Sequence, residues 1–116
     1  MTMKTAKAAS PSRNDWSSLM FDIKIIKPGE VVMSGRFDAS HVDKARSVLE
    51  QVTGTADVDM KNLQYVSSAG LGILLAAQKR LSDKGHKLRL VNMSNHVKDV
   101  FQMTRLDTIF EIVDTA

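Results

Sequence analysis

The strongest constraint on the fold of this chain is the order in which two kinds of hydrophobic periodicity follow one another. Apolar and polar residues alternate in residues 21–27 and 56–63, which is the pattern of half-buried strands. Apolar residues recur every three or four positions in residues 40–52, from Ser67 or Ser68 to Gly85, and in residues 94–104, which indicates amphipathic helices. Further strand-like runs occupy residues 31–37, 86–93 and 108–113.

The resulting order is strand, strand, helix, strand, helix, strand, helix, strand. Strands that are separated by helices of this length need crossover connections, so most of the sheet is expected to be parallel. Only the turn PGE separates the first two strands, which predicts an antiparallel hairpin. Because crossovers are right-handed, the sequence predicts one small α/β domain with a mixed, mostly parallel sheet and amphipathic helices stacked mainly on one face.

The first 19 residues differ in composition from the rest of the chain. They are small and polar, include Lys4, Lys7 and Arg13, and lack the apolar residues that folding requires. We expect residues 1–19 to be a disordered basic tail and residues 20–116 to form the domain. Because the chain contains no cysteine, no signal-peptide core and no run of about 18 apolar residues, we expect a cytoplasmic protein without membrane insertion.

The charge pattern argues against a nucleic-acid partner. The tail carries three basic residues against Asp15, so most of the formal net charge of +3 lies there and the domain is nearly neutral. A nucleic-acid surface needs a basic stripe with interleaved aromatic residues, whereas aromatic residues make up only 5% of this chain. The three histidines, His41, His86 and His96, show no spacing suited to a metal site, and we expect no metal or other cofactor.

The turn SSAGLG, residues 67–72, joins the third predicted strand to the second predicted helix. A serine at such a place commonly caps the helix by accepting a hydrogen bond from a backbone N–H of the first turn. A serine hydroxyl flanked by Ala69, Gly70 and Gly72 is also easily reached by another protein. A phosphoryl group there would add a charge of about −1.5 to −2 at the positive end of the helix dipole. The residues alone leave capping and modification as alternatives.

Enzyme functions fit this turn poorly. The segment SSAGLG lacks the glycine two residues before the serine that a nucleophile elbow requires, and no histidine base can be nominated for it. Its glycines do not have the spacing of a dinucleotide-binding loop, and no lysine-bearing phosphate loop is present in the sequence. We therefore expect a protein that is not an enzyme.

Four segments together resemble a known family. They are GRFD at residues 35–38, VDMKNLQYV at 58–66, SSAGLGILL at 67–75 and VKDVFQMTRLDTIFEI at 97–112. These segments are similar to the STAS domain of bacterial anti-sigma factor antagonists, and the similarity extends over roughly residues 21–113. The resemblance implies the STAS fold and a function in transcription regulation.

In that family, the serine at the start of the second helix is phosphorylated by an anti-sigma factor that is itself a serine kinase, and a serine phosphatase reverses the reaction. The matching position is Ser68. Ser67 stands where family members often carry aspartate and is the alternative acceptor. The resemblance implies that the unphosphorylated protein binds the kinase with its ATP or ADP and frees a sigma factor, whereas the phosphorylated protein lets the kinase go. The nucleotide belongs to the kinase, so this chain needs no cofactor of its own.

The resemblance also implies a partner-binding face around this turn. Its expected residues are Asp38, Ser67, Ser68, Ala69, Gly70, Gly72 and Ala76. Asp38 matches an acidic position of the family near the phosphorylation loop, and it is equally suited to cap the helix that begins near Ser40. STAS-like domains also occur as non-switching subunits or scaffolds, for example in lipid-transport ATPase complexes. Phosphorylation of Ser68 would distinguish a switch from such a subunit.

Overall fold

A five-stranded mixed sheet organises residues 20–113, which are the residues that the computed structural model describes. The strands lie side by side in chain order: β2 (Asp22–Lys27), β3 (Glu30–Phe37), β4 (Ala56–Val66), β5 (Leu88–Val91) and β6 (Glu111–Val113). The β2–β3 pair is antiparallel and the other three pairs are parallel. The predicted α/β class and the predicted hairpin are therefore confirmed. The expected disordered tail lies outside the described residues.

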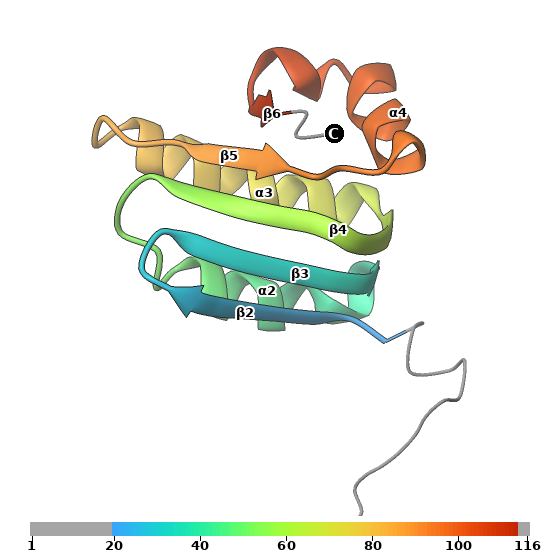
Figure 1. Cartoon of the computed structure of the whole chain (residues 1–116), viewed down its shortest axis with the longest axis horizontal. Coiled ribbons are helices and arrows are strands. Elements are labelled where there is room, and N and C mark those ends of the chain that lie inside the picture. The colour runs from blue at the N-terminus through green and yellow to red at the C-terminus, as the bar shows by residue number, and fades with distance from the viewer. Residues whose placement is uncertain (1–19, 114–116) are drawn as a thin grey trace, which may run out of the picture.

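The crossovers between the parallel strands contain α2 (Val42–Leu49), α3 (Ser68–Ser82) and α4 (Asn95–Met103). Figure 1 shows α2 and α3 side by side behind the sheet, and the two helices contact each other. Helix α4 contacts β4. Strand β4 pairs with β5 only from Ala56 to Asp59, so the second half of β4 has no partner in β5. All three helices contribute to one hydrophobic core. Within residues 20–113, no helix is both long and apolar enough to cross a membrane.

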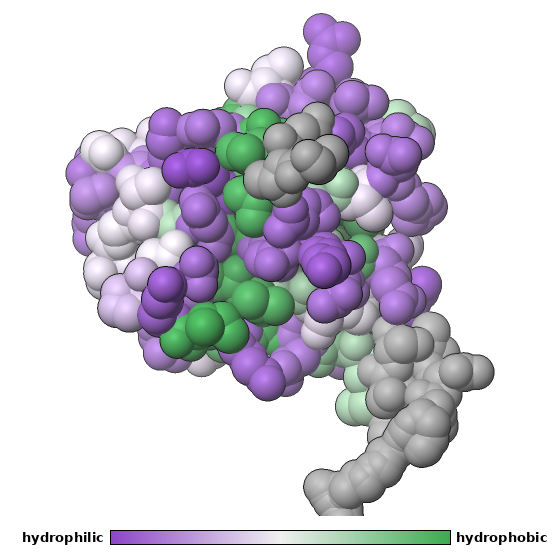
Figure 2. Space-filling model, viewed as in Figure 1, coloured by the Kyte–Doolittle hydropathy of each residue, from purple (hydrophilic) through white to green (hydrophobic). Residues whose placement is uncertain are grey.

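The two faces of the sheet differ in polarity. Along β4, the buried residues Ala56, Val58 and Met60 alternate with half-buried aspartates, as the sequence pattern predicts. On the face turned away from α2 and α3, the Arg89 guanidinium lies 3.3 Å from Asp57 and 3.7 Å from Glu111, so it links three adjacent strands. Figure 2 views this face and shows hydrophilic residues with smaller hydrophobic patches between them. Helices α2 and α3 thus cover the more apolar face of the sheet (Figure 1).

The first predicted helix, residues 40–52, is shorter in the structure and begins differently. A 3-10 turn, η1 (Ala39–His41), precedes α2, because the Asp38 carboxylate accepts a hydrogen bond from the backbone N–H of Ser40 at 3.1 Å. The backbone N–H of His41 then donates to the Asp38 carbonyl, which closes the tight turn. At the other end, Gln51 and Val52 donate to carbonyls only three residues earlier instead of continuing the helix. The prediction was correct about the helix and wrong about its ends.

The last predicted strand, residues 108–113, was also too long. Its first part lies in and after a second 3-10 turn, η2 (Leu106–Thr108), which follows Arg105 in the left-handed conformation with φ 65°. The Thr108 hydroxyl and the backbone N–H groups of Ile109 and Phe110 donate to carbonyls of residues 105 and 106. These local bonds replace sheet pairing, so β6 has only three residues. Residues 64–66, by contrast, extend β4 beyond the predicted strand.

Gly35 allows the chain that leads into β2 to lie very close to β3. Its φ is +83°, and a Cβ atom at this position would lie 1.5 Å from the carbonyl oxygen of Met20. Phe21, which follows Met20, stacks on Phe37 at a ring-centroid distance of 4.5 Å. A residue with a side chain at position 35 would therefore displace the entry of the chain into the sheet.

Two glycine-to-alanine substitutions should change stability in opposite directions. We predict that Gly35→Ala lowers the free energy of unfolding by about 2 kcal/mol or more, because it adds both a clash and an unfavourable φ. Gly72→Ala should raise it by up to about 1 kcal/mol, because Gly72 lies in a helix and a Cβ added there would have nothing within 4 Å. Urea unfolding of both variants and the parent measures the difference. Equal effects of the two substitutions would contradict this account.

Candidate partner-binding site

The candidate site forms where the carboxyl ends of β3 and β4 meet the start of α3. The backbone N–H of Ser67 donates to the carbonyl of Phe37 at 2.8 Å, which ties the ends of the two strands together. Parallel strands place their following loops and helix N-termini at one edge of the sheet, which is where binding sites of such sheets lie. The predicted position of the serine turn at this edge agrees with the structure.

The structure separates the roles of the two serines. Ser67 has an extended backbone and is the N-cap of α3, because its Oγ accepts a hydrogen bond from the backbone N–H of Gly70 at 3.1 Å. Its carbonyl accepts the first helical bond, from Leu71 at 2.9 Å. Ser68 is the first helical residue and is exposed. Ser67 therefore has the capping role that the sequence analysis considered, and Ser68 presents a hydroxyl that the cap does not use.

The small residues after the serines have two different functions. Gly70 is buried, and a Cβ there would lie 3.0 to 3.1 Å from the ring and the carbonyl of Phe37. This glycine therefore lets α3 approach β3 and lies beneath the surface of the site. Ala69 and Gly72 are exposed, and a Cβ at Gly72 would meet open space.

The exposed small residues continue along α3. Ser68, Gly72 and Ala76 are four residues apart and all exposed, so they form one ridge on the helix surface. We call these three residues the small-residue ridge. Another protein could approach the helix backbone closely along this ridge, because none of its side chains is larger than that of serine.

Asp38 lies close to the start of α3, because it follows Phe37, whose carbonyl accepts the hydrogen bond from the backbone N–H of Ser67. Its Oδ1 accepts hydrogen bonds from the backbone N–H of Ser40 at 3.1 Å and from the Ser40 hydroxyl at 2.6 Å. The hydroxyl bond is the main reason that the pKa of Asp38 lies below its ordinary value of 3.8, and the nearby Arg36 charge acts in the same direction. Asp38 therefore caps η1, and its side chain remains 43% exposed at the same edge as Ser68.

Two aromatic contacts at this edge were missed by the sequence analysis. Phe37 is fully buried in contact with the ring of Phe21 and close to the backbone of Gly70, so it supports the site from inside the core. On the other face, the Arg36 guanidinium lies 4.3 Å from the centre of the Tyr65 ring, in a cation–π contact between paired residues of β3 and β4. The alternation of residues in GRFD indicates a buried Phe37, but no sequence signal gives its partners.

The site presents a hydroxyl at a helix N-terminus that another protein can reach. The exposed Ser68 hydroxyl stands at the N-terminus of a 15-residue helix, where the helix dipole favours negative charge. The neighbouring carboxylate, Asp38, is engaged in its own cap. Within residues 20–113, no three His, Asp or Glu side chains lie close enough together to hold a metal ion.

Comparison with known families agrees with this description. The family model described as "Mlab, STAS domain" matches residues 27–114. The chain therefore belongs to the STAS domain family, and the resemblance found in the sequence is confirmed. Among its curated relatives are anti-sigma-B factor antagonists. The one from Listeria monocytogenes is 30% identical, over 72% of this chain and 76% of the relative, and the one from Staphylococcus aureus is 28% identical, over 72% and 81%.

Solved structures share the fold. The unphosphorylated form of the anti-sigma factor antagonist SpoIIAA matches with a TM-score of 0.65 and 25% identity, over 84% of this chain and 89% of SpoIIAA. The phosphorylated form of the Bacillus SpoIIAA gives a TM-score of 0.62 at 23% identity, over 84% and 92%. A putative anti-sigma factor antagonist from Thermotoga maritima gives 0.67 at 22% identity, over 82% and 86%. These relatives are regulatory proteins.

The division between the two serines predicts different stabilities for two alanine variants. Ser67→Ala should lower the free energy of unfolding by about 1 kcal/mol, because it removes the side-chain acceptor for the Gly70 N–H. Ser68→Ala should change it by less than about 0.5 kcal/mol, because the exposed hydroxyl makes no cap bond. Chemical unfolding of the parent and both variants tests this. A larger loss in Ser68→Ala than in Ser67→Ala would overturn the assignment of the cap.

Proposed function

We propose that this protein is an anti-sigma factor antagonist whose binding is switched by phosphorylation of Ser68. The observation that carries the proposal is the exposed Ser68 hydroxyl at the first position of α3. This is also the position that matches the family's phosphorylated serine. The names of the relatives support the general function, and the separation of Ser68 from the cap supports the choice between the two serines.

In the proposed unphosphorylated state, the partner is an anti-sigma factor serine kinase with ATP or ADP bound. It docks on the small-residue ridge together with Ala69, beside Asp38 and the cap formed by Ser67. Because the ridge has no large side chains, the kinase can contact the backbone of α3 closely. Binding of the kinase then frees a sigma factor, and this exchange takes place in the cytoplasm.

Phosphorylation of Ser68 would weaken this contact through charge. A phosphoserine adds about −1.5 to −2 charge, and a like-charge contact or an unpaired phosphate in an interface costs several kcal/mol. Each 1.4 kcal/mol corresponds to a tenfold loss of affinity. The same charge lies at the positive end of the α3 dipole, so the domain itself stays folded. A serine phosphatase would restore the binding state.

The acceptor can be identified with matched serine variants. Each serine kinase of the anti-sigma factor class encoded beside this chain in its source genome is purified and incubated with ATP and the protein. We expect one phosphate on the parent and on Ser67→Ala, and none on Ser68→Ala, when intact mass is measured. Ser68→Ala should still bind the kinase, whereas Ser68→Asp should bind weakly.

Two other outcomes of this experiment are informative. Phosphate on Ser67 would move the acceptor by one residue. Absence of phosphate from both serines, with every kinase of this class tested, would reject the switch and favour the non-switching subunit or scaffold function.

The ridge predicts a second, independent effect on binding. Gly72→Leu should leave the fold intact, because space is open at this position, and should abolish binding of the unphosphorylated protein to the kinase. Gly72→Ala is the control, because its single methyl group adds little bulk to the surface of the ridge. Titration calorimetry with the kinase and ADP gives the affinities. Parent-like affinity of Gly72→Leu would place the docking face elsewhere.

A further inference from the structure

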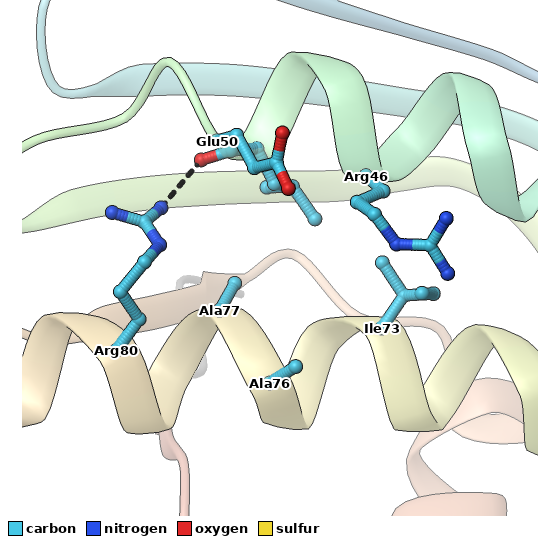
Figure 3. A pocket seen from close by; sticks show the side chains of 7 residues that line it. Arg46, Glu50, Ile73, Ala76, Ala77 and Arg80 are labelled. Atoms are coloured by element: carbon cyan, nitrogen blue, oxygen red, sulfur yellow. Dashed lines mark hydrogen bonds between the residues drawn. The ribbon is translucent and has the colours of Figure 1, made fainter.

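Two concave surfaces of this domain differ in whether their cationic side chains already have partners. The groove between α2 and α3, shown in Figure 3, is lined by Arg46 and Arg80. Arg46 lies 2.8 Å from Asp43 on its own helix, and Arg80 donates to the carbonyl of Leu49 at 2.7 Å. Both cations are therefore engaged within the domain, so charge indicates no occupant for this groove.

The second concave surface is a pocket of about 720 Å³ at the end of the sheet opposite to Ser68. It lies between the β2–β3 turn and the loop that joins α2 to β4, which are adjacent at the left of Figure 1. The backbone N–H of Asp57 donates to the carbonyl of Gly29 at 2.8 Å, which fixes the turn beside the start of β4. The walls of the pocket are therefore preformed, and its volume is within the range of about 300 to 1,000 Å³ that is typical of small-molecule sites.

This pocket combines an apolar floor with a single charge. Ile25 and the buried residues Val31 and Val52 supply the apolar side chains. Lys27 is the one charged residue among the described residues that line the pocket, and it forms no ion pair with any other residue of the described range 20–113. The other polar side chains of the lining are neutral and belong to Gln51, Thr53 and Thr55. In contrast to the α2–α3 groove, the pocket presents a cation that the domain itself does not neutralise.

We propose that this pocket binds a small amphipathic carboxylate, with its apolar chain over Val31 and Val52 and its carboxylate beside Lys27. Burial of the apolar chain supplies most of the affinity, and the single ammonium group selects a single negative charge. A phosphate monoester carries a charge of about −1.5 to −2, part of which would lack a partner at one lysine. Binding at this end of the sheet requires neither the kinase nor Ser68, so the site is separate from the proposed switch.

Straight-chain carboxylates of two lengths test the apolar floor. The probes are hexanoate and octanoate, with octan-1-ol as the uncharged control, and binding to the ¹⁵N-labelled protein is followed by the shifts of its amide resonances. Octanoate should bind roughly tenfold more tightly than hexanoate, because each buried CH₂ group contributes about fourfold in affinity. Octan-1-ol should bind more weakly than octanoate. The largest shifts should belong to residues 29–31 and 51–55.

Matched lysine variants test the charge. Lys27→Gln should weaken octanoate binding at least about threefold and leave octan-1-ol binding unchanged. Lys24→Gln is the control and should change octanoate binding less than about twofold, because Lys24 lies on the same strand, is 68% exposed and does not line the pocket. Thr53→Trp should weaken binding of both ligands, because the indole would occupy part of the pocket. Circular dichroism checks that each variant is folded.

Several results would overturn the proposal. Equal affinities of hexanoate and octanoate would show that the apolar floor is not used. Parent-like octanoate binding by Lys27→Gln would remove the lysine from the site. Shifts spread over the whole surface, or no binding of any probe at millimolar concentration, would reject the pocket as a ligand site. None of these results bears on Ser68, whose phosphorylation is measured separately, so failure of one proposal is distinguishable from failure of the other.

Discussion

The candidate site depends on the packing of Phe37 against Phe21 and Gly70. The Phe21 and Phe37 rings stack at 4.5 Å, and Phe37 also lies close to the backbone of Gly70. This contact fixes the start of α3 relative to β3, and the hydrogen bond from Ser67 to the Phe37 carbonyl adds a second link. The position of the exposed Ser68 is therefore determined by the fully buried ring of Phe37.

This arrangement gives two adjacent serines different chemistry on a single turn. The hydroxyl of Ser67 is used to satisfy the Gly70 N–H, so a phosphate on this oxygen would compete with the cap. The hydroxyl of Ser68 is exposed, and the helix dipole would stabilise a negative charge on it. A switch at Ser68 can therefore change the surface charge without loosening the helix that presents it. This separation would make the reversible modification proposed for Ser68 compatible with a stable domain.

The sequence predicted the fold well because its two hydrophobic periodicities are regular and the burial of β4 and α3 follows them. It was less accurate at the element ends, because local hydrogen bonds decide them: Asp38 starts a 3-10 turn, and Thr108 with its neighbours closes another. For the site, the SSAGLG pattern located the turn, but it left open which serine forms the cap. That choice depends on a backbone N–H lying 3.1 Å from one hydroxyl, a distance that no residue pattern contains.

The three glycines near the site, Gly35, Gly70 and Gly72, have different surroundings. This difference is the best physical reason to regard the small-residue ridge as a contact surface. A Cβ at Gly35 would clash with backbone atoms, and a Cβ at Gly70 would press against Phe37, so packing explains both glycines. Gly72 faces open space within a helix, where glycine costs about 1 kcal/mol relative to alanine. Packing within the domain does not explain why glycine is present at position 72 despite this cost. Close approach of the proposed partner would explain it, because the small-residue ridge leaves the backbone of α3 accessible from Ser68 to Ala76.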